Sequence, residues 1–315
     1  FTVIPAEPLD RRIQYGEEML RAAERTGHDL ALFHATFQRI PVALDTGDFE
    51  RVAQSLERAE ELAQRLAQPQ FVWLVKMCRT GLIIMRGDIS RAERASAEML
   101  EMGAAIGRRL EATAFHAEQM GEIRRLQGRL GEQRGRLRQK APAPQVDPVH
   151  AVLRYLCELD DEAAGPLLDR IIEERGLIPP ENMAQRSALD NLAFAACRLR
   201  RHELIQPLYE AIEPQAETFG ISAVAHHCGH HYLALLSAAA GATQRAMDHF
   251  AAAARVHERC GAPLLMAESL LDWARFVDET GASGPDPADL RRRCADVLAG
   301  HGAALLERRL AEEGG

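Results

Sequence analysis

Most of the side-chain chemistry that this sequence could support is concentrated in one run of six residues, His226-His227-Cys228-Gly229-His230-His231. Residues four apart share one face of a helix, so a helical run would supply two histidine pairs, His226 with His230 and His227 with His231. Such a pair can share a Zn²⁺ or Ni²⁺ ion. A complete site needs ligands from other helices, and the candidates are Cys228, His202, His249 and His257.

The leading interpretation of the histidine run is an ordinary polar helix start that lines a groove or faces solvent; metal binding and a ligand- or pH-sensing role are the alternatives. Two ligands do not make a site, so we predict no metal and no cofactor, and we name His226 and His230 only as the first ligands to test. The isolated histidines His34, His116 and His150 are expected to be structural. No Ser/His/Asp arrangement has supporting sequence context, which predicts a chain that is not an enzyme.

The histidine run is expected to begin a helical hairpin. We predict a first helix over Ile221–Ala240, a break at Gly241, and a second helix from Thr243, as a plausible N-cap, to Gly261. Glycine adopts the left-handed conformation that ends a helix without steric cost. Neither helix can bury its apolar face alone, so further hairpins are required to form a core.

The turn of this hairpin recurs along the chain. Equivalent turns stand at Gly47, Gly87, Gly128, Asp160, Arg200, Gly241 and Gly281, separated by 40 or 41 residues except for one interval of 32. A period near 40 built from helical hairpins is typical of α-solenoids. The fold class predicted is therefore all-α: an α-solenoid of antiparallel helix hairpins, a TPR-like superhelix of about seven repeats.

The helical periodicity predicts the remaining elements and a division of the chain. We expect helices over residues 10–26, 29–46, 49–67, 71–86, 89–106, 109–127, 149–159, 165–174, 188–199, 204–219, 262–280, 289–299 and 303–312. Pro41 should kink its helix, and Pro179-Pro180 should start another, with Glu181 in its first turn. We expect residues 1–9 to be a linker, 10–140 N-terminal repeats, 141–148 a proline-rich joint, and 149–315 C-terminal repeats with a capping helix.

Composition and charge limit the functional classes. The net charge is −8, which disfavours non-specific nucleic-acid binding. Basic residues gather in Gly121–Lys140, where a solvated helix face, a partner-docking patch or a nucleic-acid patch are the alternatives; missing aromatics and intervening acids favour the solvated face.

Six scattered cysteines without a CxxC pair, and no apolar run long enough for a membrane span, predict a cytoplasmic protein. The first residue, Phe1, predicts a piece of a longer chain.

Three segments carry a resemblance to a known group of proteins. They are Tyr232-Leu233-x-Leu235-Leu236 before Gly241, His249-Phe250-x-x-Ala253 before Arg259-Cys260-Gly261-Ala262-Pro263, and Ala267-x-x-Leu270-x-Asp272-x-Ala274. This pattern resembles the C-terminal tetratricopeptide-like region of bacterial multidomain NTPase regulators, which carry a cyclase domain or a LuxR- or SARP-type DNA-binding domain. Leu44-x-x-Gly47-Asp48-Phe49, Phe71-x-Trp73 and Met85-x-Gly87-Asp88 extend the resemblance over nearly the whole chain. The group often has Asp-Arg where this chain has His230-His231, and no phosphate loop, cyclase carboxylates or recognition helix is found here.

The resemblance implies a non-catalytic interaction and sensor region of a signalling or transcriptional regulator. Its concave groove would bind a partner protein or peptide and control a linked NTPase or output domain of the same polypeptide, without direct contact to nucleic acid or membrane. The alternatives are a small-molecule inducer receptor in the groove and a metal site at His226–His231. The residues expected to line the groove are Phe71, Trp73, Met77, His116, Gln119, Asn191, His227, His230 and Tyr232.

Overall fold

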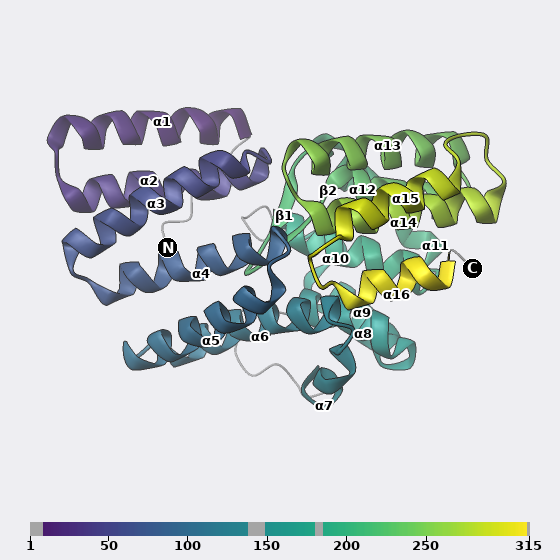
Figure 1. Cartoon of the computed structure of the whole chain (residues 1–315), viewed down its shortest axis with the longest axis horizontal. Coiled ribbons are helices and arrows are strands. Elements are labelled where there is room, and N and C mark those ends of the chain that lie inside the picture. The colour runs from purple at the N-terminus through teal and green to yellow at the C-terminus, as the bar shows by residue number, and fades with distance from the viewer. Residues whose placement is uncertain (1–8, 138–148, 180–184, 314–315) are drawn as a thin grey trace.

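A computed structural model describes residues 9–137, 149–179 and 185–313 of the chain (Figure 1). Within these ranges the chain forms sixteen α-helices, two short 3-10 helices and one two-stranded antiparallel sheet. Helices that follow one another in sequence pack side by side as antiparallel hairpins (Figure 1). The chain is therefore the all-α solenoid that the spacing of the turns predicts.

The N-terminal repeats comprise α1 (Leu9–Thr26), α2 (Asp29–Asp45), α3 (Phe49–Leu66), α4 (Pro69–Met85), α5 (Ile89–Ala105), α6 (Arg109–Leu126), η1 (Leu130–Gln133) and α7 (Arg134–Leu137). The turn glycines after α2, α4 and α6 have φ angles of 68°, 82° and 69°, in the left-handed region that favours glycine. Asp48 and Asp88 then cap α3 and α5, because each carboxylate accepts a hydrogen bond from a backbone N–H three residues on. Turn glycine and aspartate cap together explain the repeated Gly-Asp pairs.

The C-terminal repeats comprise α8 (Val149–Leu159), α9 (Asp161–Arg175), α10 (Gln185–Arg198), α11 (His202–Ile212), η2 (Glu213–Gln215), β1 (Phe219–Ile221), β2 (Ala225–Cys228), α12 (Gly229–Ala239), α13 (Thr243–Arg259), α14 (Pro263–Thr280), α15 (Pro287–Leu298) and α16 (Ala304–Glu313). Asp160 is not in the left-handed region but caps α9 by accepting from the Ala163 N–H, so α9 begins one turn before the predicted Gly165. No helix in the described ranges combines the length and apolar composition needed to cross a membrane.

The largest departure from the prediction is a β-hairpin at residues 219–228. The expected helix over Ile221–Ala240 starts only at Gly229, and the preceding helix ends at Ile212 rather than at Phe219. Strands β1 and β2 pair with Phe219 opposite Cys228. Periodicity does not distinguish a strand from a buried helix segment in a short apolar run, so the sequence predicts a helix where the structure has a β-hairpin.

Smaller differences concern helix starts and interiors. Ala242 is the N-cap of α13, and Thr243 is its first residue rather than the cap. Pro41 lies inside α2, which continues through it to Asp45. The linker was predicted over residues 1–9, but Leu9 already belongs to α1. Residues 1–8, the proline-rich joint at 141–148, and Pro180 and Glu181 of the predicted helix start lie outside the described residues.

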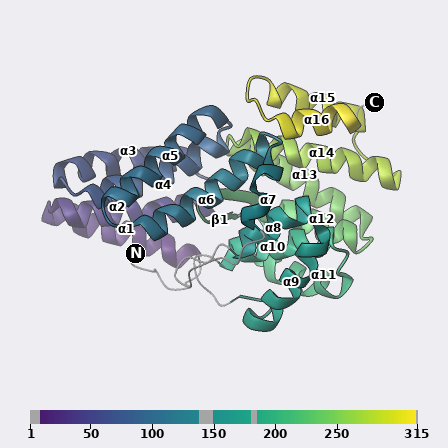
Figure 2. The same cartoon turned by 90° about the horizontal axis from the view of Figure 1, so that it is seen from below.

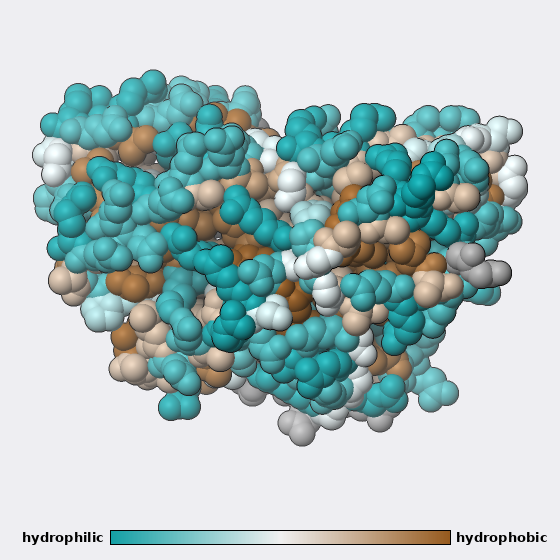
Figure 3. All heavy atoms as spheres, in the orientation of Figure 1, coloured by the Kyte–Doolittle hydropathy of each residue, from teal (hydrophilic) through white to brown (hydrophobic). Residues whose placement is uncertain are grey.

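The hairpin occupies the interior of the solenoid. Strand β1 contacts α2 and α10, and β2 contacts α4, α10, α12 and α13, so this segment touches both halves of the stack. The two halves also meet directly, since α4 contacts α14 and α6 contacts α16 (Figure 2). Hydrophobic side chains of α4 to α6 and of α13 to α16 share one core cluster. The face of the molecule that is turned to the viewer in Figure 1 is mostly hydrophilic, and hydrophobic residues are visible at its centre (Figure 3).

Candidate functional site

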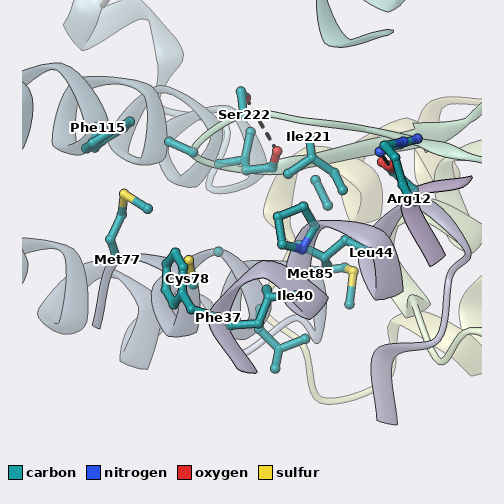
Figure 4. A pocket seen from close by; sticks show the side chains of 17 residues that line it. Arg12, Phe37, Ile40, Leu44, Met77, Cys78, Met85, Phe115, Ile221 and Ser222 are labelled. Carbon is teal, nitrogen blue, oxygen red and sulfur yellow. Dashed lines mark hydrogen bonds and ion pairs between the residues drawn. The ribbon is translucent and has the colours of Figure 1, made fainter. Parts of the chain in front are cut away.

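A cavity of about 250 Å³ lies between the N-terminal repeats and the hairpin loop. Its wall is mainly apolar and is formed by Phe37, Ile40, Pro41 and Leu44 of α2, Met77, Cys78, Gly81, Leu82 and Met85 of α4, Phe115 of α6, and residues 221–225 of the hairpin. Figure 4 shows Met77 and Phe115 at one end and Arg12 of α1 at the other. Three helices of the N-terminal half, Arg12 of α1 and the inserted hairpin segment therefore border a single, partly open space.

Each of the ionic and hydroxyl side chains on the cavity wall has a partner within the protein. Arg12 forms an ion pair with Asp45, and burial raises the pKa of the Asp45 carboxyl against the attraction of this guanidinium. The Ser222 hydroxyl donates to the carboxylate of Glu118 on α6. Burial raises the pKa of the Cys78 thiol to about 12, so Cys78 is a neutral thiol at neutral pH.

Of the residues expected to line an open groove, the aromatic ones are packed in the core. Phe71 packs against Phe33 of α2 in a tilted arrangement, with ring centroids 4.4 Å apart. Trp73 is 1% exposed, and its indole N–H donates to the Met99 carbonyl at 3.1 Å. Met77 is the one member of the predicted set that lines the cavity. Helix–helix packing, rather than an open surface, determines where these side chains lie.

His116 and Gln119 connect neighbouring helices. The Ser96 hydroxyl of α5 lies 2.9 Å from His116 Nδ1 and 2.9 Å from Gln119 Oε1. Gln119 is fully buried, and its amide nitrogen donates to the carbonyls of Met77 at 3.2 Å and Ala223 at 3.4 Å. Gln119 therefore fastens both α4 and the hairpin loop to α6.

Asn191, His227 and Tyr232 line a second, much smaller cavity of about 10 Å³, together with His226 and Arg154. Buried polar atoms without a hydrogen-bond partner gather here: Asn191 Oδ1, His226 Nδ1, His227 Nε2 and the Tyr232 hydroxyl. The space suffices for about one water molecule, and several polar groups could bind it. Burial lowers the pKa of His226 to about 3, with further lowering from nearby arginines, so its imidazole is neutral.

A chain of hydrogen bonds crosses the interior beside this small cavity. The Cys228 N–H donates to His257 Nε2 at 3.1 Å, which places the His257 proton on Nδ1, 3.2 Å from the Ser269 hydroxyl. The Ser269 O–H then donates to His231 Nδ1 at 2.9 Å, which leaves a proton on His231 Nε2, 3.7 Å from Asp272. These tautomers follow from the donors and acceptors available. The chain links β2 to α13, α14 and α12.

The histidine run does not form the predicted helical pairs, because His226 and His227 belong to β2. The rings of His227 and His231 stack with centroids 3.9 Å apart, as a consequence of the strand-to-helix turn. His230 points elsewhere, with its Nδ1 3.0 Å from His249 Nδ1 of α13. Among the described residues no three histidine, cysteine or acidic side chains are placed to hold a metal ion.

The side chains of Ser269, His231 and Asp272 contact one another in the same order as the residues of a serine-hydrolase triad. Their surroundings, however, differ from those of an active site. The Ser269 side chain is fully buried within α14, and neither cavity described above is lined by it. A nucleophile needs space for a reacting atom next to it and to oxyanion donors. The three residues fit a structural hydrogen-bond chain.

The basic segment after Gly121 is only partly a solvated face. Arg124 pairs with Glu93 at 2.6 Å, and Arg129 pairs with Glu132 at 2.8 Å on the surface. Arg125, in contrast, is 2% exposed and binds acidic residues of three helices, Glu122, Glu158 and Glu268. The sequence predicted a surface residue here because it does not show that the C-terminal repeats fold back over α6.

Sequence reasoning missed most residues of the larger cavity. Phe37, Ile40, Cys78 and Phe115 had no polar pattern to mark them, and only Pro41 stood out as unusual within a helix. No family model matches this chain, and no curated protein matches its sequence. The geometry therefore carries the functional argument.

Proposed function

We propose that this chain is the sensor region of a bacterial multidomain regulator, and that a small molecule bound in the larger cavity controls a linked NTPase or output domain. The observation that carries the proposal is the composition of the cavity wall, where helices of the N-terminal repeats face a loop of the hairpin. A molecule bound there touches the hairpin, which also contacts α10, α12 and α13. The resemblance to repeat regions of NTPase regulators suggests the output.

The route from the cavity to the C-terminal repeats runs through the hairpin. Residues 221–225 line the larger cavity, and residues 224–227 line the smaller polar one. The next residue is Cys228, and its N–H begins the hydrogen-bond chain through His257 and Ser269. A ligand that displaces the loop would therefore also shift the hydrogen-bonded residues of α12 and α14. We propose no catalytic activity for the chain itself.

The test is a thermal-shift screen of the chain against neutral, anionic and cationic fragments, repeated with two variants. Cys78→Phe fills the cavity, whereas Cys78→Ala leaves it open and slightly larger. Ligands of the cavity should raise the melting temperature of the wild type and of Cys78→Ala, but not of Cys78→Phe. A ligand at 100 times its dissociation constant stabilises by about 2.7 kcal/mol. Hits that Cys78→Phe does not abolish would contradict the proposed site.

A sensor must also change on binding. With a cavity ligand bound, amide hydrogen exchange of residues 219–228 and of α12 should slow, while exchange of α15 stays unchanged. Binding that leaves the hairpin amides unaffected would show a cavity without a sensory role.

A second candidate function is the binding of a partner peptide in the concave interior. The observation that favours it is that the interior already holds an extended segment, the hairpin, between α2, α4, α10 and α12. A partner peptide would have to displace residues 219–228 and would accelerate their hydrogen exchange. The sign of this change separates the two candidates.

A further inference from the structure

We infer that the ligand of the larger cavity is an uncharged, largely apolar molecule of about the size of a two-ring aromatic compound. This inference rests on the proposed function, because it assigns a ligand class to the same cavity. It is argued from the volume of the cavity, the charges on its wall and the hydrogen bonds already made there.

The volume sets the size of the ligand. An apolar cavity of 150 Å³ lined by leucine, isoleucine and phenylalanine stays dry and binds benzene. The cavity here measures about 250 Å³ and has a similar wall of Phe37, Ile40, Leu44, Leu82 and Phe115. It therefore has space for a second fused ring, or for a hydrocarbon chain of similar volume. Met77 and Met85 add flexible walls that adapt to the ligand's shape.

The charges on the wall exclude an ionised ligand. Arg12 and Asp45 are the charged side chains among the residues that line the cavity, and they are bound to each other. Their side chains are 20% and 18% exposed, so the pair is largely removed from water. An anionic ligand would compete with Asp45 for Arg12, and a cationic ligand would compete with Arg12 for Asp45. Either would bury a charge without a free counter-charge, which is strongly unfavourable.

The hydrogen bonds on the wall exclude a ligand rich in hydroxyl groups. The Ser222 hydroxyl donates to Glu118, the Val224 carbonyl accepts from the Ser222 N–H at 3.0 Å, and the Ala223 carbonyl accepts from Gln119. The Cys78 thiol adds only a weak donor to this wall. A sugar or a nucleotide would lose its hydrogen bonds to water without replacing them.

The first test compares three molecules of the same ring system: 2-naphthol, 2-naphthoate and 2-naphthylmethylamine. At pH 7 the first is neutral, the second anionic and the third cationic. The dissociation constant of 2-naphthol, measured by calorimetry, should be smaller than those of both ions by about tenfold or more. Cys78→Phe should abolish binding of 2-naphthol, and Cys78→Ala should retain it.

The second test asks whether removal of the Asp45 carboxylate allows the cavity to bind an anionic ligand. Asp45→Asn removes the partner of Arg12 and leaves a guanidinium at one end of the cavity without its carboxylate. The affinity of the variant for 2-naphthoate should rise about tenfold over the wild type, while the affinity for 2-naphthol changes less than about twofold. If the Arg12–Asp45 pair has a purely structural role, Asp45→Asn should weaken the binding of all three molecules equally. That result would overturn the assignment of ligand class.

The outcomes separate the ligand class from the proposed function. If 2-naphthoate or 2-naphthylmethylamine binds the wild type more tightly than 2-naphthol, in a manner that Cys78→Phe abolishes, the cavity is a receptor and only the ligand class is wrong. If none of the three binds, or if Cys78→Phe has no effect on binding, the ligand class and the cavity receptor are both wrong.

Discussion

At the scale of single residues, the buried polar groups show which contacts hold the interior together. Ser269 is fully buried between two imidazoles, accepting from His257 and donating to His231. Burial lowers the pKa of His231 to about 4, although the nearby carboxylates of Asp272 and Glu268 act in the opposite direction. Burial also lowers the pKa of His257, so both imidazoles are neutral, and the Nδ1 atom of each depends on the serine hydroxyl for its hydrogen bond.

Ser269→Ala should lower the free energy of unfolding by about 1–3 kcal/mol, because it leaves one buried donor and one buried acceptor unpaired. Urea unfolding followed by circular dichroism gives the value. Ser237→Ala is the matched control: Ser237 is also fully buried in a helix, but its hydroxyl has no partner. The control should stay within about 0.5 kcal/mol of the wild type. Equal effects of the two substitutions would refute the role given to the hydrogen-bond chain.

At the scale of elements, the hairpin is the segment on which both the cavity and the hydrogen-bond chain depend. Its close fit explains the glycine inside β1 and the glycine that follows β2. A Cβ atom on Gly220 would lie 2.0 Å from Asp190 Oδ2 and 3.1 Å from the Ser187 backbone of α10. A Cβ atom on Gly229 would lie 2.8 Å from the Ala216 backbone. The hairpin is thus held against α10 at van der Waals distance.

Gly220→Ala should destabilise the protein by about 1–3 kcal/mol, because the new methyl group overlaps Asp190, which Arg186 holds in place at 2.8 Å. The same substitution at Gly165 has the opposite expected sign. Gly165 lies within α9 with nothing near its would-be Cβ, and alanine is favoured over glycine in a helix by up to about 1 kcal/mol. Thermal unfolding of both variants checks the pair. A stabilising Gly220→Ala would mean that the hairpin is not packed against α10 as described.

At the scale of the whole molecule, the solenoid closes on itself rather than remaining an open arc. Arg125 of α6 lies at this junction, with its guanidinium 3.0 Å from Glu268 of α14 and 2.7 Å from Glu122. The adjacent positive charge of Arg125, with Arg154, holds the pKa of the buried Glu268 carboxyl well below its usual range, against the effect of burial. One buried ion-pair network therefore joins repeats that are 143 residues apart in sequence.

Arg125→Met should cost about 3–5 kcal/mol in unfolding free energy, since it removes the guanidinium that binds both Glu122 and the buried Glu268. Adding Glu268→Met in the same chain should recover part of the loss, and the double-mutant cycle isolates the coupling between the two halves. Arg129→Met serves as the control. Its pair with Glu132 has side chains about half exposed, so its loss should cost less than about 1 kcal/mol. Similar costs at positions 125 and 129 would contradict a buried junction.

The sequence by itself determined the repeat architecture. Turn glycines such as Gly47, Gly87 and Gly241 and the aspartate caps that follow some of them are local signals, because helix ends are decided by a few neighbouring residues. Helical periodicity between these turns then predicted α1, α3, α4 and α13 to within a few residues. The same local reasoning failed at residues 219–228, where short apolar runs and glycines permit either helix or strand and contacts with α10 decide between them.

Only the tertiary structure decided what the interior looks like. Arginine and histidine are common at protein surfaces, yet Arg125 and His227 are buried. Arg125 is covered because α16 packs on α6 and Glu268 of α14 binds its guanidinium, whereas His227 is covered because β2 lies against α4, α10, α12 and α13. Phe37 of α2 and Phe115 of α6 stand far apart in the sequence and meet at the same cavity because the stack curves and the hairpin fills its centre. Curvature is the sum of small rotations between neighbouring hairpins, and side-chain packing at each interface sets those rotations. A repeat pattern therefore predicts a solenoid, but not how tightly it closes or what space it leaves inside.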